Sequence, residues 1–363
     1  MKEKFDIVIL GLSITSSWGN GHATTYRGLM RALTQLGYRV LFLERDVPWY
    51  AENRDLPKPP FGRTELYANL NDLKERFRTD ILNADLVIVG SYVPEGVAVG
   101  KWVTGFCTGK AVFYDIDTPV TLAKLKRGDY QYLSPELIPR YQLYLSFTGG
   151  PILNLLEHEY GSPAARPLYC SVDMDLYYPV DMEKKYDLGY IGTYSEDRQP
   201  ALENLLVRSA RLWPQGRFSV AGSLYPDVLR WPRNVTRIDH LPASAHRMFY
   251  NSQRYTLNIT RQAMIASGYS PSVRLFEAAA CGTPIISDYW DGLEKIFAIG
   301  KEIFVSHSAE ETLSIIRELP EHDRIGAGNR ARERTLSSHT AMHRAKELES
   351  HVREVFGAVL AHE

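Results

Sequence analysis

Short apolar runs alternate with amphipathic stretches along the first part of the chain. Runs of four to six residues that are apolar throughout are typical of strands in a parallel sheet that helices cover on both faces. The predicted strands are residues 5–10, 39–43, 86–89 and 111–114, and the predicted helices are residues 23–36 and 70–82. Gly37 directly follows the first helix and is a typical helix stop. This alternation predicts a doubly wound α/β domain.

The same pattern starts again in the second part of the chain. Its predicted strands are residues 188–191, 217–221, 235–238, 255–259 and 283–287, and its predicted helices are residues 201–211 and 273–280. Between the two parts, residues 163–179 contain three prolines and no sustained period, which predicts a linker. A helical pattern from about residue 340 to residue 360 is long enough to pack back across both halves.

These patterns predict an α/β protein with two Rossmann-like, doubly wound domains that face a central cleft. We expect an N-terminal domain at residues 1–170, a C-terminal domain at residues 171–340, and a final helix at residues 341–363 that packs across both. The length of 363 residues agrees with two domains. Ligands of parallel α/β sheets bind beyond the carboxyl ends of the strands, so functional residues are expected directly after strands and in the cleft.

The composition is that of an ordinary globular protein, with 44% hydrophobic and 23% charged residues. The 42 basic and 43 acidic side chains leave a net charge of −1. This balance argues against a nucleic-acid binder held by broad electrostatics, but it leaves a local basic cleft open.

The sequence favours a cytoplasmic protein. The apolar run at the N-terminus is short and is interrupted by Gly11, so it predicts a first strand rather than a signal peptide. No stretch approaches the ~20 apolar residues of a membrane span. Cys107, Cys170 and Cys281 are odd in number and far apart, which predicts buried thiols rather than disulfides or a zinc site.

The helix predicted at residues 273–280 carries the most informative signals. Its suitable boundary residues are Ser270 or Ser272 as the N-cap, Pro271 in the first turn and Gly282 as the stop. The amide groups at such a helix start have no partner within the helix and form a ready site for phosphate.

Two charged side chains on this helix add to that site. Arg274 can bind a phosphate through two parallel hydrogen bonds. Glu277 lies about one turn further on, where its carboxylate can accept hydrogen bonds from both hydroxyl groups of a ribose. The alternative is a capped helix with an exposed Arg274–Glu277 pair at spacing i, i+3.

The sequence of this segment resembles a signature of a known family. The run Phe276-Glu277-Ala278-Ala279-Ala280-Cys281-Gly282-Thr283-Pro284 is similar to the E-A-x-A-x-G-x-P-V signature of group 1 (family 4) glycosyltransferases of the GT-B type. The segments similar to the spore-maturation (CgeB-like) branch of these enzymes are residues 114–122, 147–151, 191–194 with Arg198, and 270–282.

The resemblance implies roles for several residues. Glu277 would hold the ribose of a nucleotide donor, and the amides at Ser272 and Val273 would hold its diphosphate. The family often has a second glutamate eight residues before the first, where this chain has Tyr269. The contribution of that acid to the transferred sugar must then be made by another group.

Other candidate donor-binding residues follow predicted strands of the second half. Gly192 and Thr193 are small enough to let a ligand approach the backbone closely. Arg198 is a candidate for the diphosphate, a role that the resemblance gives to a basic residue near this position. Arg261 is a second cationic candidate. Each arginine can equally be a structural or solvated side chain.

Two histidines lie in loops after predicted strands. The resemblance places the loop of His240 near the nucleotide base, although a single histidine in a loop is often structural. His22 ends the small, polar loop of residues 13–22, which suits contact with donor phosphate or with the acceptor.

The same loop invites a dinucleotide-binding interpretation, because Gly19 and Gly21 precede a helix and Glu44 ends the next strand. The match is weak: Thr24 stands at the third glycine position, and the loop is longer than a tight strand-to-helix turn.

Asp115 and Asp117 end a predicted strand of the first half. Carboxylates at this edge can orient an acceptor hydroxyl or act as a base, and Asp117 is the better candidate. They can equally cap the helix that begins near Thr118. No histidine or third acid is spaced to complete a metal site, so none is predicted. Gly149-Gly150 forms another loop suited to close approach.

The function that these observations favour is transfer of a hexose or related sugar from a nucleotide diphosphate sugar, linked to UDP or GDP, to an unidentified acceptor hydroxyl. The resemblance implies a retaining reaction. Because no metal site is predicted, we expect the reaction to be metal-independent and to need no cofactor beyond the donor. If the reaction inverts, Asp117 or His22 is the candidate base. The acceptor can be a metabolite, a polysaccharide, a protein or a nucleic-acid base. The alternatives are a nucleotide-sugar epimerase and a non-catalytic nucleotide-sugar-binding module.

Overall fold

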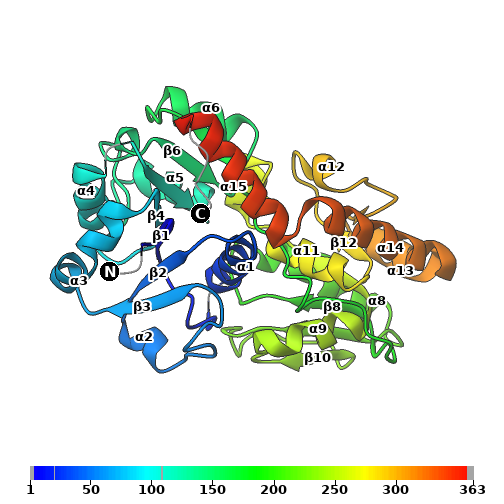
Figure 1. The fold of residues 1–363 in the computed structure, drawn as a ribbon. Coiled ribbons are helices and arrows are strands. Elements are labelled where there is room, and N and C mark those ends of the chain that lie inside the picture. The colour runs from blue at the N-terminus through cyan, green and yellow to red at the C-terminus, as the bar shows by residue number, and fades with distance from the viewer. Residues whose placement is uncertain (1–3, 20, 108, 358–363) are drawn as a thin grey trace. The chain divides into compact units, whose positions relative to one another are not determined.

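The computed structural model describes residues 4–19, 21–107 and 109–357, and these residues form two compact units (Figure 1). Unit 1 contains residues 1–171 and 341–363, and unit 2 contains residues 172–340. The chain therefore leaves unit 1 for unit 2 and returns to unit 1 for its last helix. Asn20, in the polar loop, and the end of the predicted final helix beyond residue 357 lie outside the described residues.

The described part of unit 1 contains a seven-stranded parallel sheet in the order β3-β2-β1-β4-β5-β6-β7. Its strands are β1 (Ile7–Gly11), β2 (Val40–Arg45), β3 (Arg63–Tyr67), β4 (Leu86–Gly90), β5 (Ala111–Asp115), β6 (Leu143–Ser146) and β7 (Ala165–Pro167). Its helices are α1 (His22–Gln35), α2 (Pro48–Ala51), α3 (Leu70–Asn83), α4 (Gly96–Phe106), α5 (Thr118–Lys126), the 3₁₀ turn η1 (Ile138–Arg140), α6 (Pro151–His158) and α15 (Ala341–Phe356).

The apolar runs of unit 1 are strands buried on both faces. In β1, Val8 and Leu10 belong to the core on one face of the sheet, and Ile7 and Ile9 to the core on the other. Because successive side chains point to opposite faces, a strand between two helix layers must be apolar at every position. Helix α15 packs against α1 within unit 1, close to Gly28 of α1.

The described part of unit 2 contains a six-stranded parallel sheet in the order β10-β9-β8-β11-β12-β13. Its strands are β8 (Tyr186–Ile191), β9 (Phe218–Ala221), β10 (Val235–Ile238), β11 (Gln253–Asn258), β12 (Ile285–Ser287) and β13 (Phe304–Val305). Its helices are α7 (Gln199–Leu202), the π-helix η2 (Glu203–Val207), α8 (Arg208–Leu212), α9 (Ala243–Asn251), α10 (Gln262–Ser267), α11 (Val273–Ala280), α12 (Leu293–Ile296), α13 (Ala309–Glu318) and α14 (Glu321–Ser338).

The two sheets have the same strand order. In each, the first strand of the unit lies at the centre, the next two strands extend to one side, and the fourth strand begins the other side. This is the doubly wound order, and its topological switch point lies between β1 and β4 in unit 1 and between β8 and β11 in unit 2. Ligands of such sheets bind beyond the carboxyl ends of the strands at that point.

Candidate functional site

Arg274 connects the two strands at the switch point of unit 2. Its Nε donates to the carbonyl oxygen of Ile191, the last residue of β8, at 2.6 Å. Its Nη1 donates to Oδ1 of Asn258, the last residue of β11, at 2.9 Å. Nη2 of Arg274 makes no hydrogen bond to the described residues, so this guanidinium is fixed in place with one nitrogen left for a ligand.

Three arginines gather at this switch point. Burial lowers the pKa of Arg198, and the nearby positive charges of Arg274 and Arg261 lower it further. Nη2 of Arg198 donates to the carbonyl oxygen of Thr193 at 2.6 Å, whereas its buried Nε has no hydrogen-bond partner in the described chain. Like charges held together in a partly buried place repel each other, and an anion bound among them would relieve that repulsion.

The carboxylates near these arginines have other partners. Burial raises the pKa of Asp288, whose oxygens accept hydrogen bonds from the amide and hydroxyl of Thr260, both at 2.8 Å. Asp197 accepts from the hydroxyl of Ser195 and, at 3.1 Å, from the amide of Gln262. The arginines therefore keep an excess of positive charge at the ends of β8 and β11.

Helix α11 begins at the same place, with its N-cap at one of the two predicted serines but without a side-chain capping bond. Ser272 is the N-cap, but its hydroxyl does not bind the helix amides and instead donates to Oδ1 of Asn258 at 2.8 Å. Pro271 precedes the cap rather than lying in the first turn. Because Ser272 does not cap the helix with its side chain, the amides of Val273 and Arg274 donate no hydrogen bond to its hydroxyl.

Glu277 is buried, with 5% of its surface exposed, so the alternative of an exposed Arg274–Glu277 pair was wrong. Its carboxylate accepts a hydrogen bond from the hydroxyl of Tyr250 at 3.0 Å, and Nδ1 of His246 lies 3.9 Å from the same oxygen. The sequence signal for burial was present, since α11 is apolar on both sides of Glu277. Its contact with a ribose stays a prediction.

A group of aromatic residues beside Gly192 was missed by the sequence analysis. The hydroxyl of Tyr225 donates to the carbonyl oxygen of Gly192 at 3.1 Å, and the guanidinium of Arg237 lies over the rings of Tyr225 and Trp231 at 4.2 and 4.8 Å. Gly222 has φ +148°, and a Cβ there would lie 2.0 Å from the same oxygen of Gly192. The loops after β8 and β9 therefore touch closely. His240, in the loop after β10, is exposed.

In unit 1, Tyr92 lies between the two candidate catalytic residues. Its hydroxyl donates to Oδ2 of Asp117 at 3.0 Å, and its ring contacts the ring of His22 edge-to-face, with centroids 5.2 Å apart. Asp117 is the N-cap residue of α5, but its side chain makes no capping bond there. Tyr92 has φ +64° and Glu95 has φ +56°, so the segment after β4 is strained, as is common at functional sites.

Asp115 lies beneath this group as a buried structural carboxylate. It accepts hydrogen bonds from the hydroxyls of Tyr144 and Thr121 at 2.5 and 2.8 Å and from the amide of Asp117 at 3.2 Å. Burial raises its pKa from 3.8 to about 6, against the opposing effect of the Tyr144 hydrogen bond. Asp115 thus supports the turn that presents Asp117.

This pKa shift predicts how stability depends on pH. An acid whose pKa is higher in the folded protein loses folded-state stability as pH rises from its unfolded pKa to its folded pKa, here from 3.8 to about 6. Asp115→Asn cannot ionise. We therefore expect the unfolding free energy of the wild type to fall by about 2 kcal/mol relative to Asp115→Asn between pH 4 and pH 7, because one pKa unit corresponds to 1.36 kcal/mol and the carboxyl of the unfolded chain is already partly ionised at pH 4. Urea unfolding of both proteins between pH 4 and pH 7 measures this difference. An unfolding free energy that changes equally with pH in the two proteins would contradict the prediction.

The polar loop after β1 is held by Glu44 at the end of β2. The carboxylate accepts from the amides of Ile14 and Thr15 at 2.7 and 3.0 Å, and from the hydroxyls of Thr15 and Ser13 at 2.7 and 3.3 Å. A carboxylate occupied in this way cannot bind a ribose, so the dinucleotide-binding interpretation was wrong.

The Gly149-Gly150 turn is explained by packing within unit 1. A Cβ at Gly149 would lie 2.1 Å from the hydroxyl of Tyr169, and Gly150, with φ +60°, is the N-cap of α6. Cys107, Cys170 and Cys281 are buried and form no disulfide bond, as predicted.

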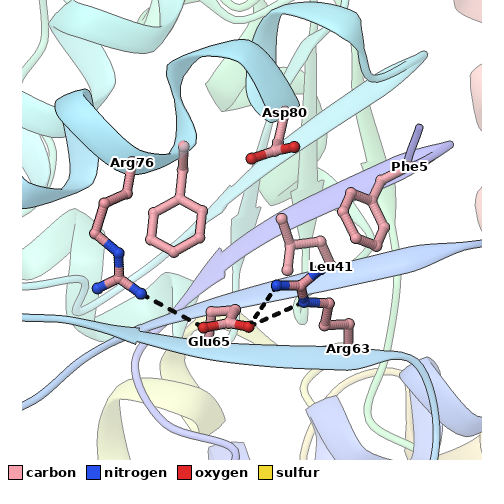
Figure 2. A pocket seen from close by; sticks show the side chains of 7 residues that line it. Phe5, Leu41, Arg63, Glu65, Arg76 and Asp80 are labelled. Carbon is pink, nitrogen blue, oxygen red and sulfur yellow. Dashed lines mark hydrogen bonds and ion pairs between the residues drawn. The ribbon is translucent and has the colours of Figure 1, made fainter. Parts of the chain in front are cut away.

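A cavity of about 260 Å³ lies elsewhere in unit 1 (Figure 2). It is lined by Phe5, Leu41, Arg63, Glu65, Arg76, Phe77 and Asp80. Phe5, Leu41 and Arg63 are at the beginnings of β1, β2 and β3, whereas His22 and Asp117 follow the ends of strands. Figure 2 shows Arg63 and Arg76 both bonded to Glu65. This cavity is therefore separate from the His22–Tyr92–Asp117 group.

The described residues offer neither a metal cluster nor a membrane-spanning helix. No group of three or more histidine, cysteine, aspartate or glutamate side chains is placed to hold a metal ion. No described helix combines the length and the apolar character needed to cross a membrane.

Comparison with known proteins gives a family match and a fold. Residues 198–350 match the model of a family described as "Glycosyl transferase-like". No curated protein sequence matches the chain.

The structure is similar to several solved structures over nearly the full length of both chains. Sucrose-phosphate synthase from Thermosynechococcus elongatus is 14% identical, with a TM-score of 0.66 over 97% of this chain and 99% of that one. HepE from Anabaena, solved with UDP and glucose, is 12% identical, with a TM-score of 0.71 over 96% and 100%. An α-glucosyltransferase in complex with UDP-glucose and DNA containing an abasic site is 13% identical, with a TM-score of 0.69 over 96% and 100%. The predicted fold class is confirmed: the chain has the GT-B fold.

Proposed function

We propose that this chain is a glycosyltransferase that moves a hexose or related sugar from a UDP-sugar to an acceptor hydroxyl. The observation that carries the proposal is the gathering of Arg198, Arg261 and Arg274 beside the start of α11, at the switch point of unit 2. The GT-B fold and the glycosyltransferase-like match at residues 198–350 support the same activity. UDP is the proposed nucleotide because the similar HepE structure contains UDP and glucose.

The arginines are placed to stabilise a nucleoside diphosphate as a leaving group. When the bond between the sugar and the diphosphate breaks, negative charge grows on the phosphate oxygen that leaves. Nη2 of Arg274 and the amides of Val273 and Arg274 are donors available to that oxygen, and the guanidinium of Arg198 adds positive charge beside them. Donors fixed before the reaction stabilise this charge without reorganisation. They also make a metal ion unnecessary, and no cofactor beyond the donor is proposed.

We assign the acceptor to the His22–Tyr92–Asp117 group of unit 1. Asp117 would accept a hydrogen bond from the acceptor hydroxyl and orient it, with Tyr92 fixing the carboxylate. The resemblance to retaining enzymes supports retention, in which the leaving phosphate oxygen takes the proton of the acceptor. The CgeB-like branch stays a prediction. The three buried free thiols support a cytoplasmic setting.

A thermal-shift panel followed by product analysis tests the proposal. A ligand that binds only the folded protein raises its melting temperature, so UDP and a UDP-sugar should do so more than uridine. The stabilising UDP-sugar should then be consumed, with release of UDP, when an acceptor is present. Conversion of the UDP-sugar to an epimer would replace the proposal with an epimerase. If the UDP-sugar binds but its sugar is transferred to none of a broad panel of acceptors, the chain would instead be a non-catalytic binding module.

A mutant cycle tests the role of Glu277. Glu277→Gln keeps an oxygen that can accept from Tyr250, so we expect it to fold. In the wild type, removing both ribose hydroxyls from UDP should weaken binding by about 10-fold to 100-fold, the value of hydrogen bonds to a charged group, ~1.5–3 kcal/mol. In Glu277→Gln, removing the same two hydroxyl groups should weaken binding by less than about threefold. Calorimetry measures all four affinities, with exposed Glu310→Gln as the control. Equal losses in both proteins would remove Glu277 from the ribose site.

A further inference from the structure

Two tryptophans form an exposed pair at the edge of unit 1 where the strands end. Trp18, in the loop after β1, is 37% exposed, and Trp49, in α2 after β2, is 60% exposed. Their rings meet edge-to-face with centroids 4.5 Å apart. Aromatic faces exposed together leave contiguous apolar surface in contact with water, which is unfavourable, and such a patch on a folded surface marks a place where a partner binds.

Hydrogen bonds between two segments of the chain hold the surface that carries the two tryptophans in a defined conformation. The amide of Leu56 donates to the carbonyl oxygen of Thr15 at 3.0 Å, and the hydroxyl of Ser16 donates to that of Asn53 at 2.6 Å. The amide and the hydroxyl of Ser17 both donate to Asp55 at 2.8 Å. These bonds join the loop after β1 to the segment after β2, so the two indoles are held in one place.

The charges around the pair are balanced. Arg27 pairs with Asp55 at 2.9 Å, and Arg54 pairs with Asp46 at 2.6 Å. In both pairs the carboxylate is the more exposed partner, at 44% and 46%, against 12% and 18% for the arginines. A polyanion such as a nucleic acid would meet exposed carboxylates here and no unpaired arginine. A neutral ligand with hydroxyl groups would meet aromatic faces with hydrogen-bond acceptors beside them.

The pair is also close to the candidate catalytic group. Trp18 precedes His22 by four residues, which span at most about 14 Å even when the chain is fully extended. A ligand that rests on Trp18 can therefore reach the His22–Tyr92–Asp117 group with one or two sugar rings.

We propose that Trp18 and Trp49 are a platform for a saccharide acceptor. The apolar face of a pyranose ring would stack on an indole, and one of its hydroxyl groups would donate to Asp46, of which only Oδ1 is engaged by Arg54. This inference rests on the proposed function, because it names the class of acceptor for that reaction. It selects a neutral saccharide over a nucleic acid, a peptide or a charged metabolite.

Binding of the labelled protein to a glycan array, with UDP present, tests the platform. We expect neutral saccharides to bind the wild type and Trp49→Phe, which keeps an aromatic face, and to bind Trp49→Ala at least tenfold more weakly. Trp18→Ala should lose binding in the same way. Leu82→Ala is the matched control, because Leu82 is 45% exposed at the opposite edge of the sheet, at the end of α3. The UDP affinity of all variants should equal that of the wild type.

Three outcomes would overturn the platform. One is the absence of saccharide binding by the wild type while UDP still binds. Another is equal saccharide binding by the wild type and the two alanine variants. Binding of a single-stranded DNA oligonucleotide that Trp49→Ala abolishes would also overturn it, in favour of a nucleobase acceptor. Failure of the wild type to bind UDP is a different result, because it contradicts the proposed function rather than the platform.

Discussion

In an Arg274→Lys variant we expect the affinity for UDP to fall by about 10-fold to 100-fold, although the positive charge is kept. The guanidinium uses Nε on Ile191 and Nη1 on Asn258, which leaves Nη2 for the diphosphate. A lysine has one nitrogen and cannot hold both strand ends and a phosphate in one geometry. Losing a hydrogen bond to a charged group costs ~1.5–3 kcal/mol, and 1.4 kcal/mol is a factor of ten.

The comparison of UDP with uridine makes this expectation specific. Uridine lacks the diphosphate, so its affinity should change less than about twofold in Arg274→Lys. Arg208→Lys is the control, since Arg208 forms an exposed ion pair with Glu310 in the same unit. Calorimetry gives all the constants. Equal losses for UDP and uridine would show that the substitution disturbs the fold of unit 2 and not a diphosphate contact.

Asn258 explains why Arg274 is held so firmly. Its Oδ1 accepts from Arg274 and from Ser272, while its Nδ2 donates to the hydroxyls of Ser287 and Thr260 at 2.9 and 3.3 Å. The amide is therefore oriented by its own donors, and both of its functions are used. By engaging the hydroxyl of Ser272, Asn258 also keeps that hydroxyl away from the amides at the start of α11. Nothing in the sequence pattern distinguished this asparagine from an ordinary strand end.

Much of the fold followed from the periodicity of apolar residues. Strands buried on both faces, such as β1 and β4, are uninterrupted apolar runs and were predicted to within two residues. Helix α11 was predicted with the observed bounds, because Ser272 precedes it and Gly282, with φ +68°, follows it. The doubly wound topology also followed from the alternation of strands and helices, because such connections adopt few arrangements, but the order of the strands was not predicted.

The missed elements lack such a signal. Strand β3 (Arg63–Tyr67) lies at the edge of its sheet, and its polar, partly exposed side chains do not form an apolar run. The helix predicted at residues 201–211 is interrupted by the π-helix at Glu203–Val207. A π turn changes the hydrogen-bond register of the backbone, and side-chain periodicity over five residues is too short to reveal it.

The candidate site was predictable where it depends on topology and not where it depends on side-chain contacts. Arg198 and Arg261 follow β8 and β11, so the rule that ligands bind at strand ends already brought them together. Tyr92 follows β4 by the same rule, but its role depends on a hydrogen bond to Asp117 and a positive φ, which a single sequence does not show. The burial of Glu277 was missed because its charge was given more weight than its apolar neighbours.

The largest effect on turnover is expected for Asp117→Asn. The amide is nearly the same size and can still accept from the hydroxyl of Tyr92, so the fold should be kept. It carries no negative charge, and it can hold the acceptor hydroxyl only weakly. Misplacing a reacting group costs about 10²-fold, as does losing a base. We therefore expect transfer to fall by about 10² or more while the UDP affinity stays within a few-fold, because the arginines proposed to bind UDP lie in unit 2.

Two further variants separate the charge of Asp117 from its surroundings. Tyr92→Phe removes only the hydroxyl that donates to Asp117, so it should reduce transfer by about 3-fold to 10-fold, in line with the loss of one hydrogen bond of ~1 kcal/mol. Asp129→Asn is the matched control, since Asp129 pairs with Lys124 near the other end of α5 and should have no effect. Initial rates of sugar transfer at saturating UDP-sugar measure all three. Full activity in Asp117→Asn would return Asp117 to a structural role and leave His22, which contacts the same tyrosine, as the residue to test next.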